Sequence, residues 1–263
     1  MEALIISIGV VTFALCAAII IFGIVVQKSS KKFKEEEFVP LVKEAFPGWN
    51  YEAEGGFSFE EYKQIGCLNW PTGFDLGTIN YKTADSVNGT TESGVKFRFC
   101  EVSLTETKTR INAKGQTQQY VVTYFSGGIF EYNHSRTIEN DTYIRDANVG
   151  TGSFFRPANM SSHNKCETDS VEFNKSFRVY SNNPEDVFYF LTPQMMERMI
   201  QLKNKYKSLI IALRSNKIYV IIPGLNLFKT PIMHSKKAID KYIDRAKADL
   251  NYFCEIPEEF DIK

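Results

Sequence analysis

The residue types that could perform chemistry in this chain are few and stand apart from one another. His163 and Cys166 are three positions apart, a spacing found in zinc sites, but no second close pair of ligands accompanies them. Cys67 or Cys100 could serve as a nucleophile with His134 only if the fold brings them together. The sequence therefore predicts no metal site, no cofactor site and no catalytic residue.

Other motifs with known chemistry are also incomplete. Adjacent carboxylates such as Glu60 and Glu61 diverge, so they do not converge on one substrate. The stretch at Gly150 lacks the Lys-Ser/Thr of a phosphate-binding loop. Phenylalanines beside basic residues, as in "VKFRF", could stack on nucleic-acid bases, but the same alternation is typical of a half-buried strand. We therefore expect a binding protein and no nucleic-acid partner.

The composition agrees with a folded protein that has no strong electrostatic preference. The chain has 31 basic and 31 acidic residues, with 43% apolar and 14% aromatic residues. A balanced charge excludes recruitment of an acidic partner by a global field. The five cysteines are widely spaced, which favours free thiols over a disulfide framework.

The amino-terminal segment has the features of a membrane span. From Leu4 to Val26 no residue is charged, and these 23 positions would form a helix of about 34 Å, enough to cross a bilayer core. Only Met1, Glu2 and Ala3 precede Leu4, so the segment lacks the basic region expected of a cleaved signal peptide. We expect a single-pass anchor in the cell membrane, with the lipid bilayer as a partner.

Four lysines follow the predicted span, and they indicate its orientation. Positive charge beside a span is retained on the cytoplasmic side, so the body is expected in the cytoplasm. The lysines could also attract anionic lipid, or serve as a topology signal alone. They are Lys28, Lys31, Lys32 and Lys34. Five Asn-x-Ser/Thr triplets would be glycosylation acceptors only in an extracytoplasmic body; they begin at Asn88, Asn133, Asn140, Asn159 and Asn174.

Hydrophobic periodicity divides the chain into an anchor at residues 1–27, a juxtamembrane helical linker at 28–48 and a globular domain at 49–263. Alternating segments from Phe74 onward predict an antiparallel β-rich, α+β domain, whose sheet could close into a barrel. The polar composition of the interval 139–172 predicts long loops. The segment "SLIIALRSNKIYVIIPG" predicts two strands joined by a tight turn at Ser215 and Asn216.

Three helices are predicted towards the carboxyl terminus. Asn183 with Pro184, and Thr192 with Pro193, have the pattern of an N-cap followed by proline at the first helical position. A methionine-rich stripe on the second helix is expected in the core. The last helix, from Ser235 to Glu255, is expected to pack on the sheet through an apolar stripe of Ile239, Tyr242, Ile243, Ala246, Leu250 and Phe253.

An aromatic cluster near the linker is a candidate recognition surface next to the membrane. The alternative is a small hydrophobic cluster beneath a loop. Its members surround Gly55 and Gly56 and are Trp49, Tyr51, Phe57, Phe59 and Tyr62.

Four tracts together resemble a known family. They are "VPLVKEAFPGWNYEAEGGFSFEEYKQIG", "VKFRFCEVSLTETKT", "FRVYSNNPEDVFYFLTPQMMERMIQL" and "KIYVIIPGLNLF". The chain is similar to the bacterial membrane proteins grouped as domain of unknown function three-one-three-seven, over about residues 39–228. The resemblance implies a bacterial membrane protein of unassigned activity and no set of functional residues.

The sequence thus predicts a membrane-anchored cytoplasmic binding or scaffolding module. Its partner would be another membrane or membrane-associated protein. Two alternatives are a membrane-anchored hydrolase with a site built from the 139–172 loops, and an extracytoplasmic sensor domain.

Overall fold

The computed structural model describes residues 32, 34–72, 77–148, 163–228 and 236–259. The chain divides into two compact units. The first comprises Met1–Pro47 with Lys229–Lys247, and the second comprises Gly48–Phe228 with Ala248–Lys263. The predicted span over Leu4–Val26 lies outside the described residues. Among the residues whose positions are described, no helix combines the length and the apolar character that a membrane crossing needs.

The first unit contains short helical elements from the predicted linker. They are η1 (Lys34–Phe38), which is a π-helix, and α2 (Val39–Ala45), with Pro40 in its first turn where its missing N–H costs nothing. The amino-terminal part of α7 (Lys236–Glu259) also belongs to this unit.

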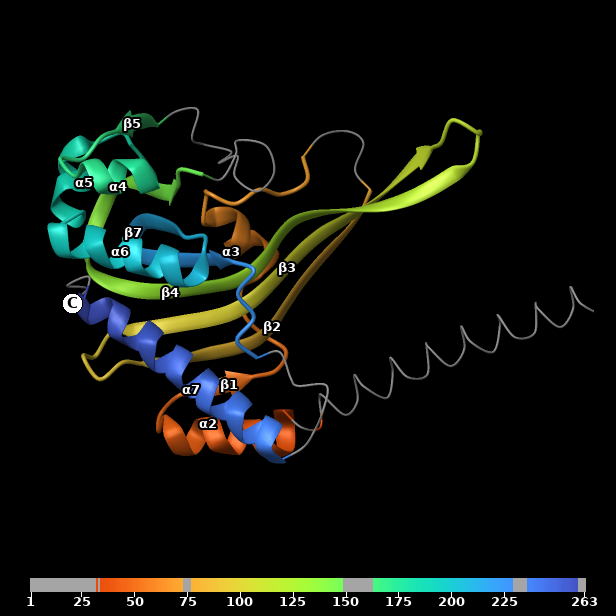
Figure 1. The fold of residues 1–263 in the computed structure, drawn as a ribbon, viewed down its shortest axis with the longest axis horizontal. Coiled ribbons are helices and arrows are strands. Elements are labelled where there is room, and N and C mark those ends of the chain that lie inside the picture. The colour runs from red at the N-terminus through yellow and green to blue at the C-terminus, as the bar shows by residue number, and fades with distance from the viewer. Residues whose placement is uncertain (1–31, 33, 73–76, 149–162, 229–235, 260–263) are drawn as a thin grey trace, which may run out of the picture. The chain divides into compact units, whose positions relative to one another are not determined.

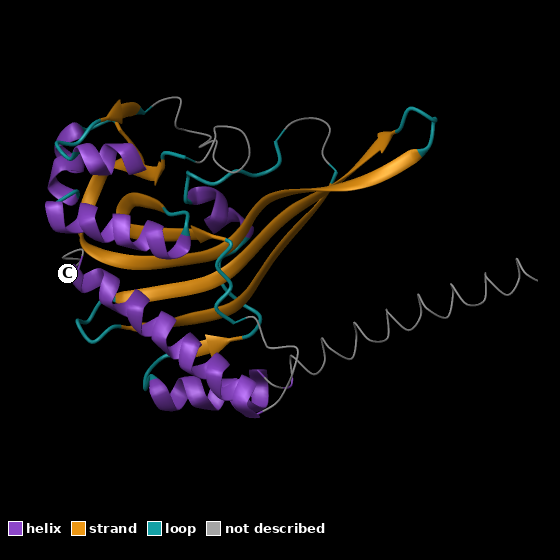
Figure 2. Ribbon diagram, in the orientation of Figure 1, coloured by secondary structure: helices purple, strands orange, loops and turns teal. Residues whose placement is uncertain are grey.

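The second unit is built on one antiparallel sheet of seven strands (Figures 1 and 2). The strands are β1 (Asn50–Glu52), β2 (Thr78–Thr90), β3 (Lys96–Ile111), β4 (Thr117–Asp146), β5 (Asn164–Cys166), β6 (Phe177–Ser181) and β7 (Ile210–Pro223). Their order is β1-β2-β3-β4-β6-β5, and β7 pairs with β4. The prediction of an antiparallel α+β fold is confirmed, but the sheet is open and does not form a barrel.

Both faces of the sheet are covered near the start of β3. Phe99 and Cys100 are neighbours that point to opposite faces, and both are fully buried. Cys100 belongs to the core cluster that includes α3 (Phe59–Gln64), whereas Phe99 packs on Phe228 on the other face. A bulge accompanies this position in the neighbouring strand β2, where the register shifts between Ala84 and Val87.

The segment from Ile210 to Pro223 is one continuous strand, so the prediction of a hairpin at Ser215 was wrong. Residues on both sides of Ser215 pair with the same strand, β4, in the same antiparallel direction. Ser215 has a φ of 52°, and it lies at a register shift opposite Ile138. A positive φ suits a bulge as well as a turn, and only the distant partner strand decides between them.

Some residues of the interval 139–172 form strands and a helix, and residues 149–162 of it lie outside the described residues. Residues 139–146 complete β4, and β5 and α4 (Val171–Ser176) begin within the interval. The loop prediction was wrong for residues 139–146, because buried polar residues in this part of β4 have hydrogen-bond partners on neighbouring elements. Thr142, for example, is buried and donates from Oγ1 to Ser181 Oγ at 2.9 Å.

The predicted helix starts are confirmed in the second unit. Asn183 caps α5 (Pro184–Phe190), and Thr192 accepts from the N–H of Met195 at the start of α6 (Pro193–Tyr206). Met195 and Met199 are buried, as expected of a core stripe. α7 buries Ile243, Ala246, Leu250 and Ile256.

Candidate binding surface

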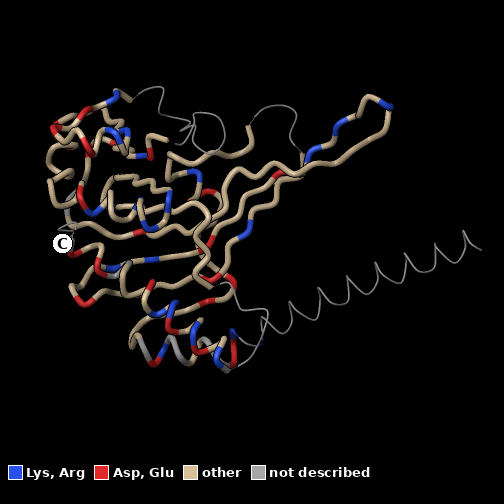
Figure 3. The backbone as a smooth tube through the Cα atoms, viewed as in Figure 1, with Lys and Arg blue, Asp and Glu red and all other residues tan. Residues whose placement is uncertain are grey.

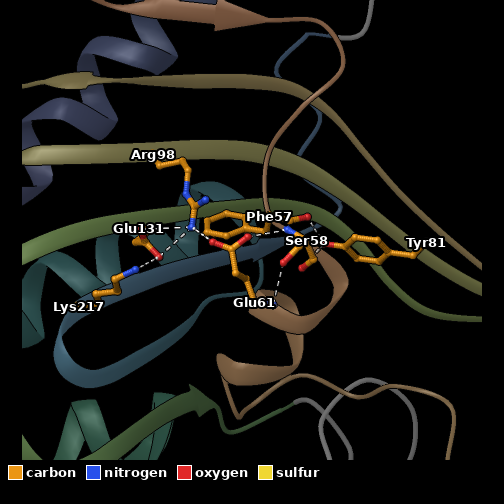
Figure 4. A network of polar contacts seen from close by, with 7 residues as sticks. All are labelled: Phe57, Ser58, Glu61, Tyr81, Arg98, Glu131 and Lys217. Atoms are coloured by element: carbon orange, nitrogen blue, oxygen red, sulfur yellow. Dashed lines mark hydrogen bonds and ion pairs between the residues drawn. The ribbon is translucent and has the colours of Figure 1, made fainter.

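A group of four charged side chains ties α3 to the sheet (Figure 4). Nη2 of Arg98 on β3 lies 2.8 Å from Oε1 of Glu61 on α3 and 3.3 Å from Oε2 of Glu131 on β4. Nζ of Lys217 on β7 lies 3.0 Å from the same Glu131 oxygen. The guanidinium of Arg98 also covers the ring of Phe57, with Cζ 4.0 Å from the centroid. Two cations and two carboxylates therefore balance within the molecule.

The same network completes the start of α3. The backbone N–H of Ser58 donates to Glu61 Oε2 at 2.7 Å, and the N–H of Glu61 donates to Ser58 Oγ at 3.2 Å, which is a capping box. Tyr81 donates from its hydroxyl to the carbonyl of Phe57 at 2.8 Å. Burial alone would raise the pKa of Glu61, but hydrogen bonds from Ser58 and Arg98 outweigh it and hold that pKa below its usual value. The geometry is that of a structural clamp.

The aromatic residues predicted as a recognition surface are placed mainly in the interior. Tyr51, Phe57 and Tyr62 are buried, and Phe57 and Tyr62 belong to the core cluster around α3. Trp49 and Phe59 are partly exposed; Trp49 packs edge-on against Phe97 at 4.8 Å between centroids. The structure therefore leaves only Trp49 and Phe59 of the five accessible to a partner.

The juxtamembrane lysines are only partly described. Lys28 and Lys31 lie outside the described residues. Lys32 is exposed, with Nζ 3.7 Å from a carboxylate oxygen of Glu36, and Lys34 is partly buried. Their interaction with lipid remains a prediction.

The cysteines and histidines do not form a site in the described part of the chain. Cys67 and Cys100 are buried, and burial raises the pKa of each thiol to about 12. They therefore stay protonated at neutral pH, unlike a nucleophilic cysteine. His134 packs against Phe190, and His163 packs against Tyr143. No group of three or more potential metal ligands is assembled among the described residues.

A two-stranded ribbon extends from the body of the second unit (Figure 1). We define the ribbon as residues 107–121, which run from the pair Thr107 and Val121, where β2 ends at Thr78, out to the turn and back. Asn112 forms its turn: the Asn112 side chain accepts from the N–H groups of Lys114 and Gln116, and Gly115 has a φ of 75°.

The two faces of the ribbon differ in chemistry. Ile111 and Val121 are 74% and 62% exposed, and both lie on a face whose other members are threonines and a glutamine. Lys108 and Arg110 lie on the opposite face, where Arg110 covers the Tyr120 ring at 5.5 Å. Figure 3 shows basic residues along the ribbon. No acidic residue occurs between Glu106 and Glu131.

Sequence reasoning missed the ribbon. Alternation from Phe74 onward predicted strands, but it did not show that two of them would extend together beyond the body. An available signal was the Asn-x-x-Gly turn at Asn112, flanked on both sides by β-forming residues without an acid.

A shallow pocket of about 590 Å³ lies between α4 and α6. Met196 and Ile200 supply apolar surface, and Asp169, Glu172 and Glu197 supply carboxylates. This face is acidic and apolar, in contrast to the basic ribbon.

Comparison with protein families identifies the chain. Residues 123–262, which are more than half of it, match the model described as "Protein of unknown function (DUF3137)". The chain belongs to this family. The predicted membership is confirmed, but the matched region starts further along the chain and ends later than the similarity over residues 39–228 indicated.

Other comparisons add little to this membership. No curated protein matches the chain. Among solved structures, the crystal structure of the mycobacterial trehalose monomycolate transport factor A, TtfA, is similar at 12% identity and a TM-score of 0.39. The similarity covers 86% of this chain and 94% of that one. At this level neither fold nor function is transferred from that protein.

Proposed function

We propose that this member of the family is a membrane-anchored cytoplasmic binding or scaffolding module that presents the ribbon to its partner. The observation that carries the proposal is the ribbon itself. Its exposed aliphatic side chains, Ile111 and Val121, lie on a projection that contributes little to the core. Exposed apolar side chains on a projection are unfavourable in water. We expect a bound partner to cover them and so to stabilise the ribbon.

Support for the anchor comes from the sequence. The uncharged stretch Leu4–Val26 followed by four lysines is the pattern of a single span with a cytoplasmic body. An anchor would hold the second unit close to membrane proteins, where the ribbon could reach them.

The hydrolase alternative finds less support in the described part of the 139–172 interval. Its polar side chains bind neighbouring elements: Asp146 pairs with Lys203 at 2.8 Å, and Thr168 donates to the Asn174 side chain at 3.1 Å. Such groups hold the fold together. The sensor alternative requires the opposite membrane topology, so a topology experiment distinguishes it from the proposed function.

Topology is tested by fusing reporters to Lys263 of the full chain. If the carboxyl terminus is cytoplasmic, as we propose, the fusion to green fluorescent protein should fluoresce and the fusion to alkaline phosphatase should be inactive. An active phosphatase with a dark fluorescent fusion would support the sensor instead. Replacing Lys28, Lys31, Lys32 and Lys34 with glutamine should weaken the orientation, because the rule counts positive residues near the span.

The ribbon's role is tested by shortening it. Replacing residues 109–119 with Asn-Gly keeps the pair Lys108 and Tyr120 and closes a tight hairpin. We expect a folded protein that fails to rescue the phenotype of a strain lacking the gene. The matched control replaces Phe188 and Tyr189, two exposed aromatic residues on α5, with serine and should rescue. Full rescue by the shortened chain would exclude the ribbon as the binding element.

A further inference from the structure

Along the ribbon, the outer edge of β4 has no partner strand among the residues that the structure describes. β3 pairs with one side of β4 from Thr117 onward, whereas pairing with β7 on the other side begins only at Gly127. Within the part of the chain that the structure describes, no strand pairs with that second side between Thr117 and Phe125. Backbone N–H and C=O groups along this edge therefore face outward in a conformation ready to pair.

This edge lacks the features that usually prevent pairing. The segment "TQQYVVTYF" contains no charged residue and no proline. Natural edge strands are commonly protected by lysine, proline or a bulge. The outer edge of β3 on the same ribbon carries Lys108 and Arg110, so it is protected. A register shift near Tyr124 limits the regular part of the β4 edge to Thr117–Thr123.

The unprotected edge is complementary to itself. If two copies pair antiparallel about Tyr120, Gln119 of one copy faces Val121 of the other, and Thr117 faces Thr123. No like charges meet across the pair, whereas two β3 edges would bring Lys108 and Arg110 of both copies together. A two-fold arrangement is also the commonest form of self-association.

We propose that the β4 edge from Thr117 to Thr123 pairs antiparallel with the same segment of a second copy of this chain, so that two ribbons form one continuous four-stranded sheet. The inference rests on the proposed function, because it names the partner that the ribbon binds. Backbone hydrogen bonds across the edge supply the attraction, and the uncharged side chains permit close approach.

Two matched double variants test which strand forms the contact. Gln119→Lys with Val121→Lys places like charges across the proposed pair, whereas Thr109→Lys with Ile111→Lys places the same charges on β3. Both variants change the same face of the ribbon, and each removes one exposed aliphatic side chain. The full chain is purified in nanodiscs, and its mass is measured by native mass spectrometry or light scattering across a dilution series.

We expect a dimer for the wild type and for the β3 variant. The dissociation constant of the β4 variant should rise about tenfold or more, since two like-charged cross-strand pairs are introduced. A monomeric wild type would overturn the proposal. Equal weakening by both variants would also overturn it, because the face rather than the edge would then form the contact.

Photo-crosslinking in cells separates this inference from the proposed function. A benzophenone amino acid at position 120 of the full chain should yield an adduct of two copies, and the same group at position 114 on the turn should yield none. An adduct with a different protein at position 120 would overturn pairing with a second copy but retain the ribbon as a binding element. Adducts with lipid alone would assign the ribbon to the membrane surface and overturn the pairing. No adduct at either position would overturn both proposals.

Discussion

Nη2 of Arg98 lies 2.8 Å from Oε1 of Glu61, although 37 positions separate the two residues in the chain. Glu61 belongs to a helix of six residues, which is too short to be stable by itself. The ion pair, the capping box and the contact of Arg98 with Phe57 together hold this helix on the sheet. The clamp thus fixes the position of α3 over the core.

Replacing Glu61 with glutamine should change how stability depends on pH. Glutamine preserves the capping box, so the variant removes chiefly the charge. Because the folded-state pKa of Glu61 is lowered, the unfolded chain binds more protons, and the stabilisation is present above the unfolded pKa of about 4.3. It is lost as the pH falls through the folded pKa.

We therefore expect wild type to be more stable than Glu61→Gln at pH 7, with a difference that shrinks below about pH 4.3. Urea unfolding between pH 7 and pH 3 measures it. Glu60→Gln on the same helix is the control, because Glu60 is 74% exposed and its ion pair with Lys63 contributes little. A constant difference for Glu61→Gln at every pH would contradict the lowered pKa.

Replacing Lys203 with methionine should destabilise the protein by about 3 kcal/mol. Nζ of Lys203 lies 2.8 Å from Asp146, whose side chain is 3% exposed, and it also donates to the carbonyl of Ser176. Its removal leaves a buried carboxylate without its cation. Lys205→Met, two positions along α6, breaks a more exposed pair with Asp249 and should cost about 1 kcal/mol or less. Equal unfolding midpoints for the two variants would contradict this difference.

Truncating Leu250 to alanine should lower the free energy of unfolding by about 2 to 5 kcal/mol. Leu250 is 1% exposed, in the part of α7 that belongs to the second unit. Asn251→Ala changes the adjacent exposed position and should lie within about 0.5 kcal/mol of wild type. Thermal or urea unfolding of wild type, Leu250→Ala and Asn251→Ala measures these differences. An unchanged Leu250→Ala would show that this stripe is solvated in solution.

Cys67 and Cys100 should resist thiol reagents in the folded protein. Both side chains are buried, so the reagent cannot reach them. The pKa of each thiol is raised to about 12, so at pH 8 each is protonated and lacks the reactive thiolate. Cys166 is partly exposed and should be labelled before Cys67 and Cys100. Peptide mass spectrometry after a pulse of maleimide, with and without urea, tests the order. Native labelling of Cys67 or Cys100 at the rate of Cys166 would contradict the closed core.

Local features of the fold could be predicted from the sequence because they depend on adjacent residues. Asn183 and Thr192 cap helices through their own neighbours, so the pattern of a cap followed by proline identified both starts. The burial of Leu250 followed from its spacing on an apolar stripe. Family membership also required only the order of residues along the chain.

The tertiary structure decided what depends on distant residues. Ser215 has a backbone conformation that suits a turn or a bulge, and its pairing with β4 selects the bulge. Phe57 and Tyr62 have the types of a recognition surface, but packing beneath the Arg98 clamp and in the core buries them. The ribbon is exposed because β3 and β4 extend beyond the strands that flank them. Strand length and flanking partners come from separate segments, so no single stretch of sequence contains this surface.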